Sequence, residues 1–412
     1  MLPPHLDYML KSRASALLTV GAIAWQTVRV AEPLKNMFGP EMVHRAATSI
    51  VAVYPNFDVD GFTAAALDGF EDLELTPRCH QIASAMAVFL PEDRGRAIDI
   101  LIESLGPELE NCDPADAKPT GDPDFDGNVM AGFFYLPHGY FLAAHGSDHF
   151  EKTMLANYEI TKRATSEFSI RTPLRDHTAA TLEYLAEWVH DENVHVRRLV
   201  SEGTRPRLPW SFRLKAFEQD PTPILPLLEE LKDDPVEYVR RSVANNLNDI
   251  AKDHPEVVTE IARRWWADGD RNRHRLIRHA MRTLIKAGNL DALDVMGYGP
   301  ASPAKVTNVS IDPTEIAIGG KVTVEATIEN PDTSPAGALV DIRVHFVKAN
   351  GTTSPKVFKG AEFELAPGES REVRKTISLA QHSTRKHYPG RHKVEIAING
   401  KTEPGGSFVL SG

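Results

Sequence analysis

The chain has 412 residues, of which 42% are hydrophobic and 25% are charged, and its formal net charge is −11. This length and composition predict a globular protein of two or three domains. Its two cysteines, Cys79 and Cys112, exclude a disulfide-stapled fold, and no cysteine–histidine pattern has the spacing of a zinc site. We therefore expect a protein of the reducing cytoplasm with no metal and no other cofactor.

Residues 1–30 form an apolar extension. The run Ala14–Trp25 follows Lys11 and Arg13, which gives it some likeness to a secretory signal. The run is too short to span a membrane, and the aspartate and two prolines before it do not suit a signal. We expect a short appended helix, or a segment upstream of a working start near Ala31, and no membrane partner. A true signal is the alternative.

Residues 31–299 have the pattern of a helical domain. Apolar residues recur at helical spacing, for example in the windows 182–190, 224–232 and 257–266. Pro255 stands where it can open the last of these helices, because proline is favoured at the first helical position. The sequence therefore predicts a mainly α-helical domain over this range.

A five-residue motif repeats inside the helical part. Val196–Val200 recurs as Val239–Val243, 239 − 196 = 43 residues later, and Ile277–Met281 is a weaker echo 277 − 239 = 38 residues beyond that. A turn rich in Asp, Glu or Asn precedes the first two copies. Two helices for every forty-odd residues is typical of HEAT-like repeats. We predict an α-solenoid in which the second helices of the repeats line one concave face.

Arginines recur with this motif and suit a polyanion. Guanidinium groups bind phosphates in a bidentate manner, and phosphates repeat along a duplex. The alternative is that these arginines pair with acidic residues of the neighbouring repeat. The negative net charge disfavours nucleic acid, but it is unevenly spread: residues 58–126 hold 17 acidic and 4 basic residues, while residues 371–401 hold 2 and 8.

Three polar segments each carry one carboxylate after basic residues. The carboxylates are Glu167, Glu202 and Asp249. If the segments belong to successive repeats, the three side chains approach one another on the concave face. Arg198 lies four residues before Glu202 and shares its helix face. The alternatives are a helix-end salt bridge for Glu167 and a cap or arginine partner for Asp249.

The helix exit after Glu202 combines this carboxylate with an aromatic residue. Gly203 is placed to turn the chain, Arg205 to tether the carboxylate, and two prolines stiffen the path to Trp210. An indole face beside a carboxylate attracts a cation. The same anions could stabilise an oxocarbenium-like state or position a water molecule. The alternative for Trp210 is a packing role in the core.

The periodicity of the apolar residues changes after a linker at residues 297–305. Segments such as 321–330 and 392–400 alternate apolar and polar residues with period two and are rich in Val, Ile and Thr. Turn pairs separate them: Asn330-Pro331, Asn350-Gly351, Pro367-Gly368 and Asn399-Gly400. Residues 300–412 are therefore expected to form an all-β immunoglobulin-like sandwich, after a helical domain at 31–299.

Four stretches carry a family resemblance. Residues 31–39, 165–171, 195–210 and 238–255 closely resemble the bacterial DNA alkylation repair glycosylases built from HEAT-like repeats, specifically the AlkC branch. The sandwich resembles the immunoglobulin-like domain that some AlkC members carry. The resemblance implies an N-glycosylase that releases 3-methyladenine and 3-methylcytosine from double-stranded DNA in base excision repair, without base flipping.

The resemblance also implies roles for individual residues. Glu167, Glu202 and Asp249 would be the active-site carboxylates, Trp210 would contact the lesion and its deoxyribose, and Arg198 would orient the carboxylates. The remaining arginines of these segments become candidates for phosphate binding or for the charge network around the site. They are Arg197, Arg205, Arg207, Arg240 and Arg241.

The basic segment 383–393 of the sandwich is a second candidate DNA contact. Its side chains could reach the duplex through the minor groove, and the alternative is a solubilising loop. The basic residues in question are Arg385, Lys386, Arg391 and Lys393.

The expected enzyme is a monomeric, monofunctional glycosylase. No lysine stands out as a Schiff-base nucleophile, so strand cleavage is not expected. The alternative function is a non-catalytic HEAT-repeat scaffold that binds DNA or protein.

Overall fold

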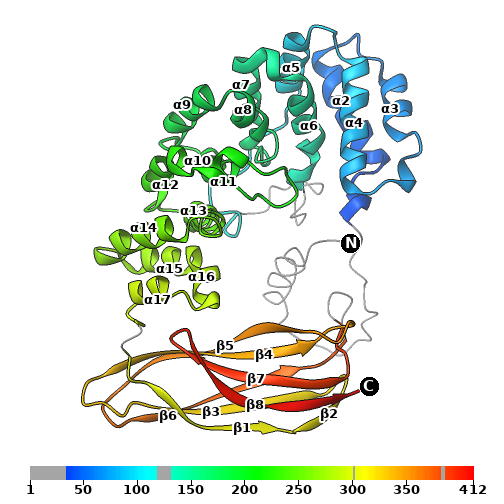
Figure 1. Cartoon of the computed structure of the whole chain (residues 1–412). Coiled ribbons are helices and arrows are strands. Elements are labelled where there is room, and N and C mark those ends of the chain that lie inside the picture. Colours follow the sequence, from blue (N-terminus) through cyan, green and yellow to red (C-terminus); the bar gives the residue numbers. More distant parts are fainter. Residues whose placement is uncertain (1–33, 118–130, 300–301, 382–385) are drawn as a thin grey trace. The chain divides into compact units, whose positions relative to one another are not determined.

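The computed structural model describes residues 34–117, 131–299, 302–381 and 386–412 (Figure 1). Its tertiary contacts divide the chain into two compact units, which separate between Thr283 and Leu284. The first unit is helical. The second contains the end of α16 (Arg282–Ala287), α17 (Leu290–Val295) and the strands.

The helical unit is a succession of short helices joined by tight connections. Its α-helices are α2 (Pro40–Val53), α3 (Val59–Leu67), α4 (Leu75–Phe89), α5 (Arg94–Glu103), α6 (Leu136–His145), α7 (Phe150–Thr161), α8 (Arg171–Asp176), α9 (Thr178–Trp188), α10 (Val194–Gly203), α11 (Lys215–Gln219), α12 (Leu225–Leu231), α13 (Glu237–Ile250), α14 (Pro255–Ala267) and α15 (Arg271–Ala280). Its 3-10 turns are η2 (Leu34–Met37), η3 (Phe70–Asp72), η4 (Ala131–Tyr135), η5 (Ser147–His149) and η6 (Thr222–Ile224).

The helices predicted from apolar spacing are confirmed. The three windows 182–190, 224–232 and 257–266 fall on α9, α12 and α14. Pro255 is the first residue of α14, as expected, because its missing N–H needs no partner there.

The repeated motif occupies three neighbouring helices. Its copies lie on α10, α13 and α15, and α13 packs against both of the others (Figure 1). The helices that alternate with them along the chain fill the space beside them, since α12 packs on α10 and α13, and α14 packs on α13 and α15. The motif valines, such as Val196 and Val239, are fully buried. The arginines that follow them therefore face away from this apolar contact.

A buried arginine holds together the turns at the beginning of the helical unit. Arg78 of α4 is 3% exposed. It donates hydrogen bonds to the carbonyl oxygens of Lys35 (2.8 Å), Phe38 (2.9 Å), Leu73 (2.9 Å) and Glu71 (3.3 Å). One guanidinium group thus satisfies four backbone carbonyls in and beside the turns η2 and η3, and unsatisfied carbonyls cost free energy when buried.

The strands form two sheets that enclose an apolar core. They are β1 (Lys305–Asp312), β2 (Glu315–Ala317), β3 (Lys321–Glu329), β4 (Ala336–Val347), β5 (Thr353–Leu365), β6 (Ser370–Ser378), β7 (Gly390–Ile398) and β8 (Lys401–Ser411). One sheet has the order β1-β3-β6 and the other β2-β8-β7-β4-β5, as Figure 1 shows in yellow to red. Alternate residues of β3, such as Val322 and Val324, are buried, which is the expected burial pattern of a sandwich.

The predicted turns of the sandwich are confirmed. Each of the four turn pairs lies between two consecutive strands. Asn399 and Gly400 have φ values of 48° and 80°, the left-handed conformation that a two-residue hairpin requires. Strands β5 and β8 had no clear sequence signal. β5 pairs with β4 through a bulge at Val340/Asp341, and β8 contains Pro404, so neither strand alternates cleanly.

The last two helices pack on the strands. Gly288 and Gly400 approach so closely that a Cβ on Gly288 would lie 3.1 Å from the backbone of Gly400. The Tyr298 hydroxyl donates to Glu362 Oε1 at 2.5 Å, and Ser302 donates to the Gly337 carbonyl at 2.8 Å. These contacts fix α17 and the segment after it to the sheet that contains β4.

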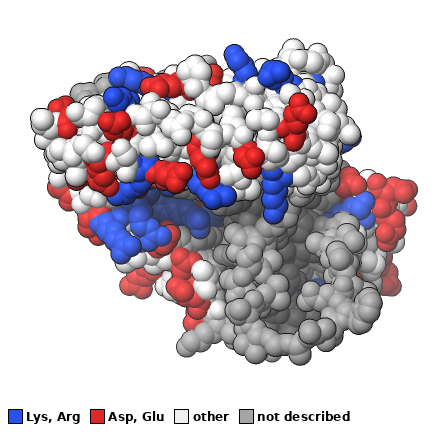
Figure 2. Space-filling model, turned by 90° about the horizontal axis from the view of Figure 1, so that it is seen from below, with Lys and Arg blue, Asp and Glu red and all other residues white. Residues whose placement is uncertain are grey.

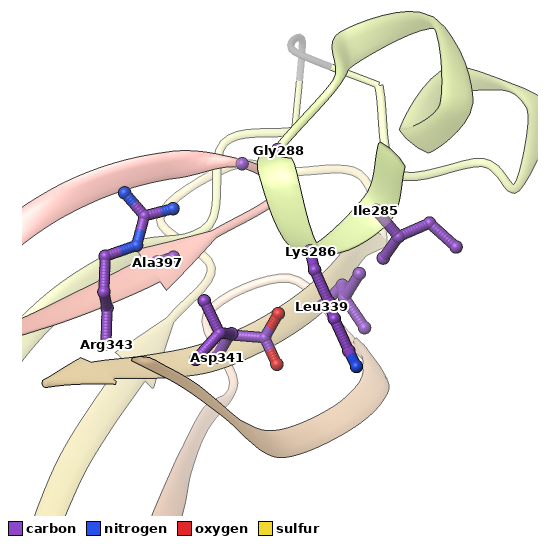
Figure 3. Close-up of a pocket in the computed structure, with 9 residues that line it drawn as sticks. Ile285, Lys286, Gly288, Leu339, Asp341, Arg343 and Ala397 are labelled. Atoms are coloured by element: carbon purple, nitrogen blue, oxygen red, sulfur yellow. The ribbon is translucent and has the colours of Figure 1, made fainter. Parts of the chain in front are cut away.

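A small cavity lies where α16 meets this sheet (Figure 3). Figure 3 shows the carboxylate of Asp341, on β4, pointing toward the side chain of Lys286 from α16, with Arg343 further along β4. Burial raises the pKa of Asp341, although Lys359 and Lys286 oppose this shift. The cavity measures about 10 Å³, room for about one water molecule, so it is no substrate site.

Candidate active site

The carboxylates predicted from the three polar segments lie at the contact between α10 and α13. Glu202 is at the end of α10, Asp249 at the end of α13, and Glu167 precedes α8. The end of α10 packs closely on the segment after Glu167, because a Cβ on Gly203 would lie 2.6 Å from Ile170. Gly203 is the last helical residue and has no positive φ, so it does not turn the chain out of the helix as expected. Its glycine serves close packing instead.

Glu202 is a buried carboxylate with three donors around it. Its Oε1 accepts from Arg205 Nη1 at 2.6 Å and its Oε2 accepts from Ser242 Oγ at 2.7 Å. Arg198 Nη2 lies 3.6 Å from the same Oε2. Burial alone would raise the pKa of Glu202, but Arg205 and Arg198 outweigh it and lower the pKa to about 2. Glu202 is therefore ionised at neutral pH.

Two arginines link the three carboxylates into one chain. Arg198 Nη1 donates to Glu167 Oε2 at 2.6 Å while its Nη2 faces Glu202. Arg205 Nε donates to Asp249 Oδ2 at 2.8 Å while its Nη1 bonds to Glu202. The order of contacts is Glu167, Arg198, Glu202, Arg205, Asp249. The structure thus brings together residues that lie up to 82 positions apart (249 − 167) in the sequence.

Polar side chains that sequence reasoning did not single out lock α10 to α13. Ser201 Oγ donates to Ser242 Oγ at 2.7 Å, and Ser242 in turn donates to Glu202. Asn246 Nδ2 donates to the Ser201 carbonyl at 2.8 Å and to Thr204 Oγ1 at 2.9 Å. In the sequence, these contacts could have been recognised by small polar residues that recur at helix positions otherwise occupied by apolar side chains. Their hydrogen bonds fix the rotamer of Glu202.

A second residue missed from the sequence is Arg171, at the start of α8. It is fully buried and donates to the carbonyls of Gly203 (3.0 Å), Arg205 (2.6 Å) and Phe212 (2.6 and 3.1 Å). Burial, and then Arg205, lower the pKa of Arg171 to about 10. Arg171 therefore clamps both ends of the segment from Gly203 to Phe212, which also carries Trp210.

Trp210 is half-buried on this clamped segment. Its φ of 66° is left-handed, a conformation that costs a bulky residue on the order of 1–3 kcal/mol. The segment includes Arg205, whose side chain bridges Glu202 and Asp249, and it ends at exposed Phe212. The left-handed backbone at Trp210 aims its ring in a direction that ordinary extended backbone would not give.

The predicted phosphate ligands fall into two groups. Arg197, with its side chain 13% exposed, donates to Asp234 at 2.6 Å, which is the pairing with an acidic residue of the next repeat. Arg207 pairs with Asp253 at 2.6 Å at the surface. By contrast, Arg241 is exposed and has no ion pair within 4.0 Å in the described residues.

A pocket of about 180 Å³ between α13 and α15 collects basic side chains. Arg240, Arg241, Arg275 and His279 line it, and Arg240 donates to the Asp234 carbonyl. Burial, Arg282 and Arg241 lower the pKa of His279 to about 4, so its ring is neutral at pH 7. Figure 2 shows Lys and Arg side chains interspersed with Asp and Glu on the face that it draws.

The candidates in the sandwich lie around the start of β7. Arg385 is outside the described residues. Lys386, Arg391 and Lys393 are exposed, and Arg391 Nη1 donates to Ser407 Oγ at 2.9 Å. Their positions leave the charges open to a ligand in solution.

Neither metal ligation nor a membrane span is found in the part of the chain that the structure describes. No group of three or more His, Cys, Asp or Glu side chains there could hold a metal ion. No helix in those ranges is long and apolar enough to cross a membrane. The functional explanation has to start from the carboxylate–arginine chain.

Comparisons with known proteins agree on a family. A family model described as the C-terminal immunoglobulin-like domain of the uncharacterised protein YhaZ matches residues 305–412. The uncharacterized protein YhaZ of Bacillus subtilis (strain 168) is 31% identical over 378 residues, covering 92% of this chain and 99% of its own. The structure of Pseudomonas fluorescens alkylpurine DNA glycosylase AlkC, bound to DNA containing an abasic site analog, is 34% identical, with a TM-score of 0.80, and covers 92% of this chain and 100% of that one. The chain therefore belongs to the AlkC branch of the bacterial DNA alkylation repair glycosylases, in the form that carries a C-terminal immunoglobulin-like domain.

Proposed function

We propose that this protein is a monofunctional DNA N-glycosylase of base excision repair, acting as a monomer in the cytoplasm. Its substrates are cationic N3-methylated bases, 3-methyladenine and 3-methylcytosine, in double-stranded DNA. Family membership supports this, since the Pseudomonas fluorescens relative is named an alkylpurine DNA glycosylase. The observation that carries the proposal is the buried chain of three carboxylates, linked by Arg198 and Arg205, on the α10–α13 contact.

The chemistry of a cationic base matches a site whose central carboxylate, Glu202, is ionised at neutral pH. When the C1′–N bond breaks, its electron pair goes to the base, which departs neutral, and the positive charge passes to the sugar. Water then adds to C1′ and loses a proton. No acid has to protonate the leaving base, and Glu202, with its lowered pKa of about 2, could not do so. Fixed anions stabilise the sugar cation instead.

The residues of the carboxylate–arginine chain, together with Trp210, then have the following roles. Glu202 and Asp249 stabilise the oxocarbenium-like state and position the attacking water, without base flipping. Arg198 orients Glu167 and Glu202 through its two hydrogen-bonding nitrogens. Trp210 contacts the lesion and its deoxyribose, where an indole face attracts the cationic base by about 0.5–2 kcal/mol.

The motif helices provide the surface for the duplex. We assign residues 31–299 to a HEAT-like solenoid with α10, α13 and α15 on its concave face, and residues 300–412 to the immunoglobulin-like domain. Arg207, Arg240 and Arg241 bind backbone phosphates. Arg197 and Arg205 act in the charge network, because their partners are buried carboxylates.

Base release is the direct test. The full chain is incubated with N-methylated duplex DNA, and free 3-methyladenine and 3-methylcytosine are measured by liquid chromatography and mass spectrometry. We expect both bases to appear, with abasic sites but no strand breaks. Folded protein that binds the duplex and releases neither base would support a non-catalytic scaffold in place of the glycosylase.

The basic residues at the start of β7 give a second prediction. Replacing Arg385, Lys386, Arg391 and Lys393 with Ala should weaken binding to undamaged duplex. Each lost phosphate contact should reduce the slope of log K against log salt by about 0.9. Fluorescence anisotropy at several salt concentrations measures both quantities.

A control removes the same charge from other exposed sites of the sandwich. Its four Ala substitutions replace Lys305, Lys321, Lys348 and Lys359. Equal salt slopes for the two variants would show that the β7 residues only solubilise the protein.

A further inference from the structure

The two oxygens of Asp249 have different kinds of partner. Oδ2 accepts from Arg205 Nε at 2.8 Å, and Oδ1 accepts from Lys252 Nζ at 2.7 Å. The Asp249 side chain is 2% exposed and that of Arg205 is 10% exposed, whereas that of Lys252 is 39% exposed. One oxygen is thus held from inside the protein and the other from its surface.

Lys252 is the most easily replaced cation of the site. Arg198 and Arg205 each contact two carboxylates through a rigid planar group. Lys252 follows the end of α13, in a turn, and Asp249 is the one acidic partner within 4.0 Å in the described ranges. The Lys252 ammonium is flexible, partly exposed and held by a single ion pair, and ion pairs that are open to solvent contribute about 0–1 kcal/mol.

The charges of the site show why a cation here matters. The three carboxylates, Glu167, Glu202 and Asp249, are bridged by two guanidinium groups, those of Arg198 and Arg205. The ion pair between Lys252 and Asp249 supplies a third positive charge. A cationic base, or the sugar cation that follows it, could supply the same charge at Asp249. It therefore competes with Lys252 for this position.

We propose that Lys252 is a displaceable counterion. In the DNA-free protein its ammonium occupies the cation-binding position at Asp249 Oδ1, and the cationic nucleotide takes this position while Lys252 turns to a DNA phosphate. This inference rests on the proposed function and adds to it a residue that controls access to the site. Lys252 is a positioning residue, since it leaves the reacting atoms as the substrate arrives.

Two synthetic duplexes test the competition for Asp249. One contains a pyrrolidine abasic analogue, which is protonated and mimics the sugar cation, and the other contains the neutral tetrahydrofuran analogue. Lys252→Met removes the internal competitor, so we expect the preference for the cationic over the neutral duplex to rise by up to about fivefold over wild type.

Two further variants separate this effect from a loss of charge or of structure. Lys252→Arg keeps the positive charge, and should keep the wild-type preference. Lys232→Met is the matched control, because Lys232 pairs at 3.1 Å with Glu229, three residues earlier, as Lys252 pairs with Asp249. We expect no change in preference for this variant. Thermal unfolding of all three establishes that they are folded.

The outcomes separate the two levels of the proposal. If wild type prefers the cationic duplex and Lys252→Met shows the same or a smaller preference, Lys252 does not compete and the inference is wrong. If wild type binds neither analogue more tightly than undamaged duplex, the proposed glycosylase function fails and this inference fails with it.

Discussion

Glu202→Gln is expected to lower the release of 3-methyladenine by about 10²–10³-fold, the loss seen when one preorganised electrostatic group is removed from an active site. Glutamine keeps the shape of the side chain but leaves Arg205 and Arg198 without the anion between them. Binding to undamaged duplex should stay nearly intact, because Glu202 is buried and faces no phosphate. Single-turnover base release and anisotropy measure the two effects.

A matched control exists for the stability cost of this change. Glu218 has a side chain 8% exposed, compared with 7% for Glu202, and it also pairs with arginines, Arg207 and Arg213. Glu218→Gln therefore removes a similarly buried anion from beside two arginines, and it should leave base release per folded molecule unchanged. Full activity of the Glu202 variant, or an equal loss in the Glu218 variant, would remove Glu202 from the catalytic group.

The stability difference between wild type and Glu202→Gln should depend on pH. The folded-state pKa of Glu202, about 2, is below its ordinary value of 4.5. A lowered carboxylate pKa stabilises the fold above the unfolded pKa, and the stabilisation is lost as the pH falls through the folded one. We expect a difference of about 3 kcal/mol in the free energy of unfolding above pH 5 that shrinks between pH 4.5 and 2. Urea unfolding at several pH values measures it.

Arg171→Met should lower both stability and base release. The substitution leaves the carbonyls of Gly203, Arg205 and Phe212 without their donor inside the protein, at a cost of about 1–3 kcal/mol each. Removing a buried charge offsets part of this, because burial disfavours the ionised arginine, so we expect a net loss of about 3–5 kcal/mol. The freed segment no longer fixes Arg205 and Trp210, and release should fall at least tenfold.

Arg78 provides the control for this effect. It is a buried arginine that donates to four backbone carbonyls in the α2–α4 region and contacts none of the site residues. Arg78→Met should lower the unfolding temperature similarly, while base release per folded molecule stays at the wild-type value. If Arg171→Met also retains wild-type release at a temperature where it is folded, Arg171 has a structural role alone.

Much of the fold could be predicted from local pattern. Helices α9, α12 and α14 and the turn at Asn399-Gly400 were predicted because hydrophobic period and left-handed turn residues act over a few positions. Strand β8 was not, since its proline, glycines and bulge obscure the period of two. The boundary between the two packed units could not be predicted from local sequence pattern either, because α17 is a helix but packs on the strands of the second unit.

The candidate site was predicted in part, and the limits have a physical reason. The motif repeat, with its spacing of 43 residues, placed Glu202 and Asp249 on neighbouring helices, so we could expect them to approach each other. Arg171 and Lys252 carried no such signal. A buried arginine and a surface lysine look alike in sequence, and only the carbonyls and carboxylates around them distinguish their roles.

By itself the sequence determined which helices and strands form, the family to which the chain belongs, and the set of charged residues from which a site could be made. The tertiary structure decided which of those charges neutralise one another. Arg197 and Arg205 are committed to buried carboxylates, whereas Arg241 stays open to solvent. The reason is that helix and strand formation depend on residues that are near neighbours in the chain. These ion pairs join side chains about forty residues apart in the sequence, and their atoms come within bonding distance only once the helices have packed.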